Sequence, residues 1–192
     1  LIERCREAVT AADKVLAAAK ASVRVKIQEA GGIDNAQHVA HGLAWLATAV
    51  EGLRQMHDWA SRRSGEGRFG EFEQLLLAAA FAEYLAQIGG GIPMSQLEII
   101  RTDALGVSKA EIRRFEDAVY DLVAEGGAET VKARLAEFIA AQPGAMTFGD
   151  TGLDEIHAEI QNLMRDFCLN EVNPVAHEWH LKNEYIPLDI IE

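Results

Sequence analysis

Apolar residues recur along the first third of the chain at the spacing of an α-helix. The first stripe alternates steps of four and three residues, a period of about 3.5 that is typical of a helix with one buried face. Its members are Cys5, Val9, Ala12, Leu16, Ala19 and Val23. A second stripe comprises Val39, Leu43, Leu46, Val50, Leu53, His57 and Ala60. The pattern predicts two long helices, the first ended by Gly31 and Gly32, the second capped by Asn35 and continuing to about Ser64.

A third helix is expected after residues 64–70, because the glycines of this loop break the apolar pattern. The helix should run from about Glu71 to Ile88 and end at the glycine triplet 89–91. The face expected to be buried consists of Phe72, Leu76, Ala79, Ala82 and Leu85.

Weaker patterns follow Pro93, beginning with a short helix expected from Ser95 to about Arg101. Residues 108–111 have the form of a capping box, in which a hydroxyl and a carboxylate satisfy the first backbone N–H groups of a helix. They predict a helix over 109–125, closed by a glycine pair. The next helix should cover 128–142, with an inward face of Val131, Leu135, Phe138 and Ile139.

The pattern divides the chain into three parts. Residues 1–142 are expected to form an antiparallel helical bundle, and residues 143–152, with one proline and three glycines, are the expected linker. Residues 153–192 should hold a further helix that Pro174 kinks or interrupts. The apolar face of this helix consists of Ile156, Ile160, Leu163, Met164 and Phe167. No stretch alternates cleanly between apolar and polar residues, so the expected fold class is all-α with essentially no sheet.

Both ends have the sequence of interrupted helices. The first residues, Leu1 onward, have helical character with no capping residue ahead of them. Pro187 suits the first position of a helix, and only five residues follow it. Such a short helix is marginal alone, so we expect the sequence to be a piece of a longer protein.

Composition narrows the class of protein. The formal charge of −12 argues against nucleic acid and anionic membrane surfaces as partners, because such binding depends on Lys and Arg. No apolar run approaches the ~18–20 residues that a membrane span needs. Cys5 and Cys168 lie too far apart in sequence for a disulfide framework or a paired-cysteine metal motif. We therefore expect a cytoplasmic protein with reduced thiols.

Histidines are the first candidates for chemistry in a helical bundle. His38 and His41 are three residues apart, as are His177 and His180, while residues 154–157 place an aspartate three residues before a histidine. A di-iron bundle needs two Glu-x-x-His motifs and two further glutamates, and the zinc-protease motif needs histidines four apart. Neither pattern is present, so we predict packing or surface histidines and assign no metal ligand.

Other motifs are also better explained by packing. The glycine triplet 89–91 follows a helix rather than a strand and lacks the Lys-Ser or Lys-Thr of a phosphate-binding loop. Cys168 is expected to be a small buried hydrophobe. The tryptophans, Trp45, Trp59 and Trp179, are expected to be core or interface anchors. We assign no catalytic, cofactor-binding or metal-binding residue.

Two segments carry a resemblance to a known family. Residues 156–192 resemble the opening of the acyl-CoA dehydrogenases, in which Arg-x-Phe, Glu-Val-x-Pro and a downstream Ile-Pro precede a helix that leads into the flavin-binding body. The matching residues are Arg165, Phe167, Glu171, Val172, Pro174, Ile186 and Pro187. Residues 35–106 are similar to a long N-terminal extension found in one branch of that family. The segments that carry this second similarity are 41–48, 66–71 and 83–96.

The resemblance implies an FAD-dependent enzyme that oxidises an acyl-CoA and forms homo-oligomers. In that family a catalytic glutamate removes the α-proton while hydride passes from the β-carbon to the flavin. No residue of this sequence matches the family's flavin-binding or catalytic motifs, so the resemblance implies an inactive, structural N-terminal portion. Two alternatives stay open: a free-standing helical interaction module, and a helical metal or haem enzyme.

Overall fold

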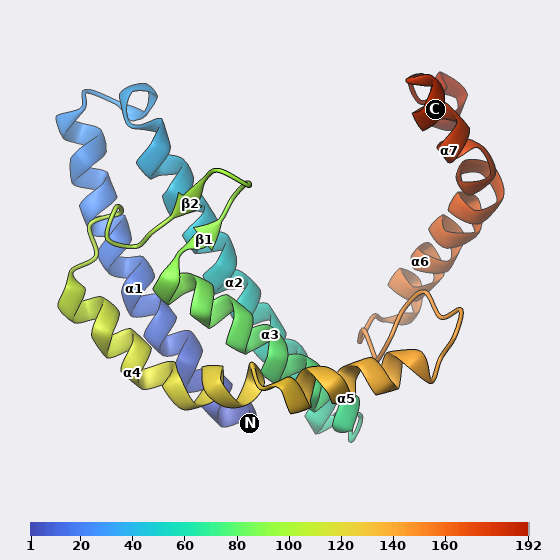
Figure 1. Cartoon of the computed structure of the whole chain (residues 1–192), viewed down its shortest axis with the longest axis horizontal. Helices are drawn as coiled ribbons and strands as arrows, with labels where there is room; N and C mark the ends of the chain where they lie inside the picture. Colours follow the sequence, from blue (N-terminus) through green and yellow to red (C-terminus); the bar gives the residue numbers. More distant parts are fainter. Residues whose placement is uncertain (192) are drawn as a thin grey trace. The chain divides into compact units, whose positions relative to one another are not determined.

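The computed structural model describes residues 1–191 and divides into two compact units, Leu1–Asp150 and Thr151–Glu192. Both units consist mainly of α-helices, so the all-α fold class is confirmed (Figure 1). The paired strands among residues 1–191 are only two residues long each. None of the described helices has the length and apolar content that crossing a bilayer requires.

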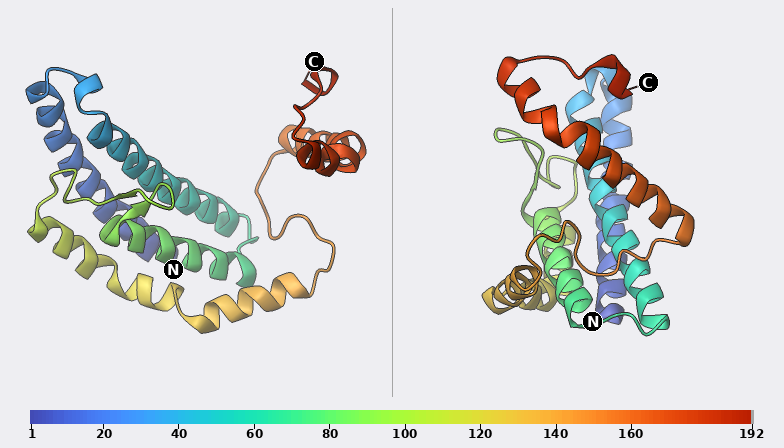
Figure 2. Two further views of the ribbon diagram at one scale, coloured as in Figure 1. Left: turned by 45° about the horizontal axis from the view of Figure 1, so that its top comes forward. Right: turned by 90° about the vertical axis from the view of Figure 1, so that its right-hand side faces the viewer.

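The first unit begins with two long antiparallel helices, α1 (Ile2–Glu29) and α2 (Gln37–Gly65) (Figure 2). All six residues of the first predicted stripe are buried, which confirms the expected face of α1. In α2 the buried stripe residues are Leu46, Val50, Leu53 and Ala60. An ion pair joins the two helices, with Arg54 Nη2 at 2.7 Å from Asp13 Oδ1.

The turn between α1 and α2 differs from the expected one. Asn35 does not cap α2, because it lies in a short 3₁₀ turn, η1 (Ile33–Asn35), and its side-chain Nδ2 donates to the Ala30 carbonyl at 2.9 Å. Gly32 adopts a φ of 138° that favours glycine, and its N–H donates to the Ile27 carbonyl at 3.0 Å. The asparagine therefore closes the end of α1, and α2 begins two residues later.

Helix α3 (Glu71–Gly90) lies where it was expected, but its buried face is rotated from the predicted one. Leu76 is 40% exposed, whereas Leu77 and Phe81 are almost completely buried. The buried residues of α3 are Leu77, Phe81, Ala82, Leu85 and Ile88. Because residues 75–82 are apolar without interruption, the sequence gives this helix no clear phase.

A β-hairpin replaces the short helix expected from Ser95 to Arg101, and that prediction was wrong. Strands β1 (Ile92–Pro93) and β2 (Ile99–Ile100) pair in antiparallel register. The hairpin packs closely on α2, since a Cβ at Gly42 would lie 2.8 Å from Cδ1 of Ile100. Burial of Ile100 against this glycine, rather than local helix propensity, explains the extended backbone.

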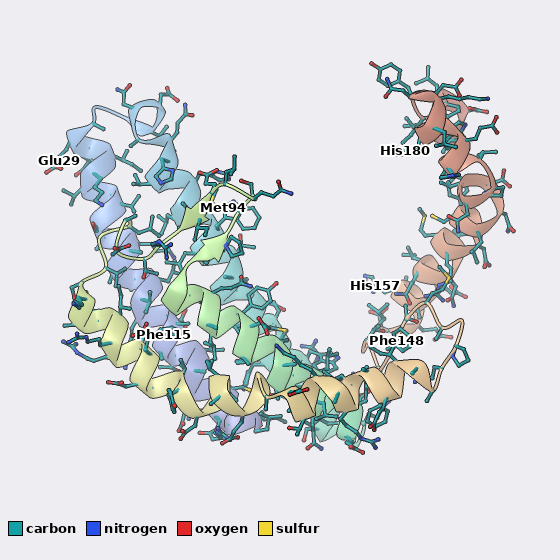
Figure 3. The ribbon with its side chains drawn as sticks, viewed as in Figure 1. Glu29, Met94, Phe115, Phe148, His157 and His180 are labelled. Atoms are coloured by element: carbon teal, nitrogen blue, oxygen red, sulfur yellow. The ribbon has the colours of Figure 1, made fainter. Side chains whose placement is uncertain are left out.

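Helix α4 (Lys109–Gly126) begins with the predicted capping box. The Glu111 N–H donates to Ser108 Oγ at 3.3 Å, and the Ser108 N–H donates to Glu111 Oε2 at 2.9 Å. The Ser108 hydroxyl also donates to Glu111 Oε2 at 2.6 Å, and this bond, followed by the one from the Ser108 N–H, lowers the pKa of the Glu111 carboxyl. Phe115 is buried on this helix and lines hollows shared with α1 and with α3 (Figure 3).

Helix α5 (Glu129–Ala140) confirms only part of its expected inward face. Val131, Leu135 and Phe138 are half-buried, but Ile139 is exposed. The Phe138 ring meets the Phe72 ring edge-on, with 5.5 Å between centroids. This aromatic contact and the ion pair between Arg134 Nε and Glu71 Oε1, at 2.8 Å, both join α5 to the start of α3.

The second unit contains α6 (Glu155–Phe167), a π-helical turn (Cys168–Val172), α7 (Asn173–Lys182) and α8 (Leu188–Ile191). The π turn and Pro174 together confirm the expected interruption, because proline cannot donate the hydrogen bond of a continuous helix. The predicted apolar face of α6 is exposed in this unit. Its exposed residues are Ile156, Ile160, Leu163, Met164 and Phe167.

Candidate functional site

The histidines of the described residues do not gather at one site. On α2, His38 Nδ1 lies 3.4 Å from Glu98 Oε1 of the hairpin turn, and His41 Nε2 accepts a bond from Trp45 Nε1 at 2.9 Å. In the second unit, His157 lies at the start of α6 and His180 near the end of α7 (Figure 3). Within residues 1–191, no group of three His, Cys, Asp or Glu side chains is placed to hold a metal ion.

Asp154 explains the Asp-x-x-His spacing without a metal. Its Oδ1 accepts the His157 backbone N–H at 2.9 Å and lies 2.7 Å from His157 Nδ1. The backbone bond, followed by the ring bond, lowers the pKa of the Asp154 carboxyl. The pair is a helix N-cap of the kind that stabilises the first turn of α6.

The two cysteines have opposite environments. Cys5 is completely buried in α1, and burial raises the pKa of its thiol to about 12. Cys168 is exposed at the start of the π-helical turn, so the prediction that it is a buried hydrophobe was wrong. The apolar face of α6 lacks a covering element within its own unit, which leaves the cysteine beside it in solvent.

The difference predicts unequal thiol reactivity. In the native chain, Ellman's reagent should titrate one thiol promptly at pH 8, because only Cys168 is exposed. The second thiol should react once denaturant unfolds α1. A Cys168→Ser variant should lose the prompt phase, whereas prompt reaction of that variant would contradict the burial of Cys5.

The glycine triplet contributes to a groove between the end of α3 and helix α4. The groove has a volume of about 490 Å³. Its apolar wall consists of Leu85, Phe115, Val119 and Val123. Gly89 and Gly90 are small enough to leave it open, and both charged residues that line it, Glu116 and Asp117, are acidic.

The two hollows that Gly89 and Gly90 line do not fit FAD. The acidic side chains of the groove would repel the diphosphate of the cofactor. A second hollow of about 370 Å³ contains Arg101 and Lys109, but Arg101 Nη1 already donates to the Gly90 carbonyl at 2.8 Å. Asp103 adds a negative charge to the same hollow. The groove can therefore bind an apolar or cationic surface, and neither hollow supplies a phosphate cradle.

A polar network of the first unit forms around Asp150. Its carboxylate Oδ2 lies 2.7 Å from Arg68 Nε and 3.3 Å from Arg63 Nη1. Its backbone carbonyl accepts from Trp59 Nε1 at 2.9 Å, and its N–H donates to Glu73 Oε1 at 3.2 Å. The network joins a residue of the predicted linker to the end of α2 and the start of α3.

No sequence pattern predicted this network. Asp150 lies in the glycine-rich segment predicted to be a linker, and its partners Arg63 and Trp59 are 87 and 91 residues away. The expected anchoring role of Trp59 is fulfilled here, since its indole also packs edge-on against Phe69 at 6.1 Å between centroids. Trp45, in contrast, is partly exposed on α2.

No family model matches the chain, but a curated protein is similar to it. The chain is 46% identical over 160 residues to a (2S)-methylsuccinyl-CoA dehydrogenase of Cereibacter sphaeroides. The match covers 83% of this chain and 29% of that protein, so the chain spans less than a third of the relative's length. The similarity confirms the resemblance to the acyl-CoA dehydrogenases and identifies this chain as similar to a portion of one of them.

Proposed function

We propose that this chain is the N-terminal helical portion of an FAD-dependent acyl-CoA dehydrogenase. The enzyme would oxidise (2S)-methylsuccinyl-CoA to mesaconyl-CoA in the cytoplasm, as part of the ethylmalonyl-CoA pathway. The observation that carries the proposal is the 46% identity over 83% of the chain. A continuous span of 160 residues within 192 includes residues 33–160, so the similarity involves the helical unit and not only the motifs after residue 156.

Within that enzyme, the chain would have a structural role and no activity of its own. The described residues offer stable helix packing and an acidic groove rather than a proton-abstracting base beside a flavin site. FAD would bind to the remainder of the enzyme and would supply the hydride-accepting chemistry there. Residues 1–142 would pack on that remainder or shape a homo-oligomer, and residues 153–192 would begin the dehydrogenase α-domain.

The exposed face of α6 supports this role for the second unit. Five large apolar side chains along one helix face are exposed, a pattern typical of a surface that another part of a protein covers. The remainder of the dehydrogenase is the occupant that the sequence similarity suggests.

The experiment compares the intact enzyme with a version that lacks residues 1–142. We expect the intact enzyme to oxidise (2S)-methylsuccinyl-CoA with an artificial electron acceptor, and the shortened version to change in oligomeric mass or to unfold at a lower temperature. The isolated chain should show neither activity nor flavin absorption. No oxidation by the intact enzyme would refute the substrate, and unchanged mass and unfolding temperature would refute the structural role.

The groove between α3 and α4 favours a second candidate, a free-standing interaction module. Its apolar wall and acidic edge suit a helix or peptide with basic flanks. The reading frame beyond Glu192 distinguishes the two, because only the first candidate requires a flavin domain downstream.

A further inference from the structure

The polypeptide that follows α5 packs back against α2 and α3 at Gly149 and Asp150. Asp150 uses its N–H, its carbonyl oxygen and its carboxylate there, in bonds to Glu73, Trp59 and the arginines Arg63 and Arg68. Three of these partners come from the last turns of α2 and the loop after it, and the fourth from the first turn of α3. The contact therefore involves backbone and side chain together.

Burial makes this contact strong compared with the surface ion pairs of the chain. The side chain of Arg63 is 6% exposed and that of Asp150 is 20% exposed, whereas Arg4 and Glu125 are 41% and 65% exposed. The guanidinium of Arg63 has two anionic partners among the described residues, Asp150 and Glu66. Removing Asp150 would leave a buried cation with one partner, which costs far more than loss of an exposed pair.

Gly149, the residue before Asp150, is suited to the same close contact with α3. Gly149 has a φ of 73°, which L-residues with a side chain rarely adopt. A Cβ at this position would also lie 2.9 Å from the Phe72 ring and 3.2 Å from Glu73 Oε1. Glycine thus allows the backbone to approach α3 closely enough for the Asp150 N–H to reach Glu73.

We propose that Asp150 acts as a latch. Its bonds keep residues 143–150 on the first unit, so that the connector, the chain between the first unit and α6, is shortened. With the latch closed, three residues (151–153) separate Asp150 from Asp154, the N-cap of α6. Three residues can reach at most about 10 Å, whereas the eleven residues 143–153 can reach at most about 36 Å. Opening the latch would lengthen the tether and lower the effective concentration of anything that the second unit carries. The proposal rests only on contacts within the first unit and does not depend on the proposed enzyme activity.

Limited digestion of the whole chain by chymotrypsin tests the latch, with cleavage sites identified by mass spectrometry. Phe148 is half-buried within the latched segment, and Tyr185, which is 95% exposed in the second unit, is an internal reference site. In Asp150→Ala we expect cleavage after Phe148 to accelerate at least about tenfold, because digestion of a segment follows its opening equilibrium. Cleavage after Tyr185 should keep its rate.

Two further variants complete the test. Asp117→Ala removes an exposed carboxylate of α4 and should leave both rates unchanged. Arg68→Ala removes the exposed partner, keeps Arg63 with Asp150, and should accelerate cleavage after Phe148 by a smaller factor. Equal rates after Phe148 in the parent chain, Asp150→Ala and Arg68→Ala would overturn the latch. A parallel rise in cleavage after the buried Phe81 would also overturn it, because Asp150 would then support the whole unit instead of the connector.

Discussion

Replacing Phe81 with alanine should lower the free energy of unfolding of the chain by about 3–5 kcal/mol. The Phe81 ring is completely buried in α3, and its neighbours in the core come from several helices. Truncation removes the transfer free energy of the ring and leaves a cavity that rigid helices fill only partly. Urea unfolding followed by circular dichroism would measure the change as a lower midpoint at similar slope.

Leu76→Ala is the matched control, because the sequence pattern alone places Leu76 on the buried face of the same helix. The side chain is 40% exposed in the structure, so its truncation should cost less than about 1 kcal/mol. A larger loss for Leu76→Ala than for Phe81→Ala would mean that α3 has the phase expected from the sequence.

Regular amphipathic helices were the part of this fold that could be predicted. In α1 charged residues such as Arg6, Asp13 and Lys20 interrupt the apolar pattern, so one helix phase buries the stripe. The capping box at Ser108 and Glu111 could also be predicted, because the two residues bond to each other's backbone and need no distant partner. Local sequence patterns therefore predict a helix and its buried face when only one arrangement satisfies them.

Three failures share a cause, which is competition from the rest of the molecule. Asn35 has a suitable side chain for a helix cap, but the end of α1 offers the Ala30 carbonyl instead. Residues 95–101 could form a helix alone, but Ile100 is buried against α2 at Gly42. Helix α3 is apolar on nearly all sides, so only its neighbours determine which side is covered.

The candidate site was even harder to predict from the sequence, because its contacts also depend on residues that are distant in the chain. Sequence analysis assigned no catalytic, cofactor or metal residue, and the similarity to a dehydrogenase reaches a portion that has no recognised catalytic motif. Asp150 was missed because a single aspartate among glycines has no signal of its own. A weak signal existed in Arg63 and Arg68, two arginines around a loop, but a pairing across 87 residues has no periodicity to reveal it.

Replacing Gly126 with alanine should destabilise the chain by about 2–3 kcal/mol, although alanine is the better helix former. A Cβ at Gly126 would lie 2.2 Å from the Ala78 carbonyl oxygen and 2.8 Å from its carbon. Both atoms belong to the backbone of α3, which cannot rotate away as a flexible side chain could. The added methyl group must therefore separate α3 from α4, and the loss of packing exceeds the ~1 kcal/mol gained in helix propensity.

Gly65→Ala is the matched control, because it raises helix propensity without a steric clash. Gly65 is exposed at the end of α2, and a Cβ there would have no neighbour within 4 Å. This variant should be neutral or more stable by up to about 1 kcal/mol in the same urea titration. If Gly126→Ala matched Gly65→Ala, the close crossing of α3 and α4 would be wrong, and with it the groove that these helices form beside Gly89 and Gly90.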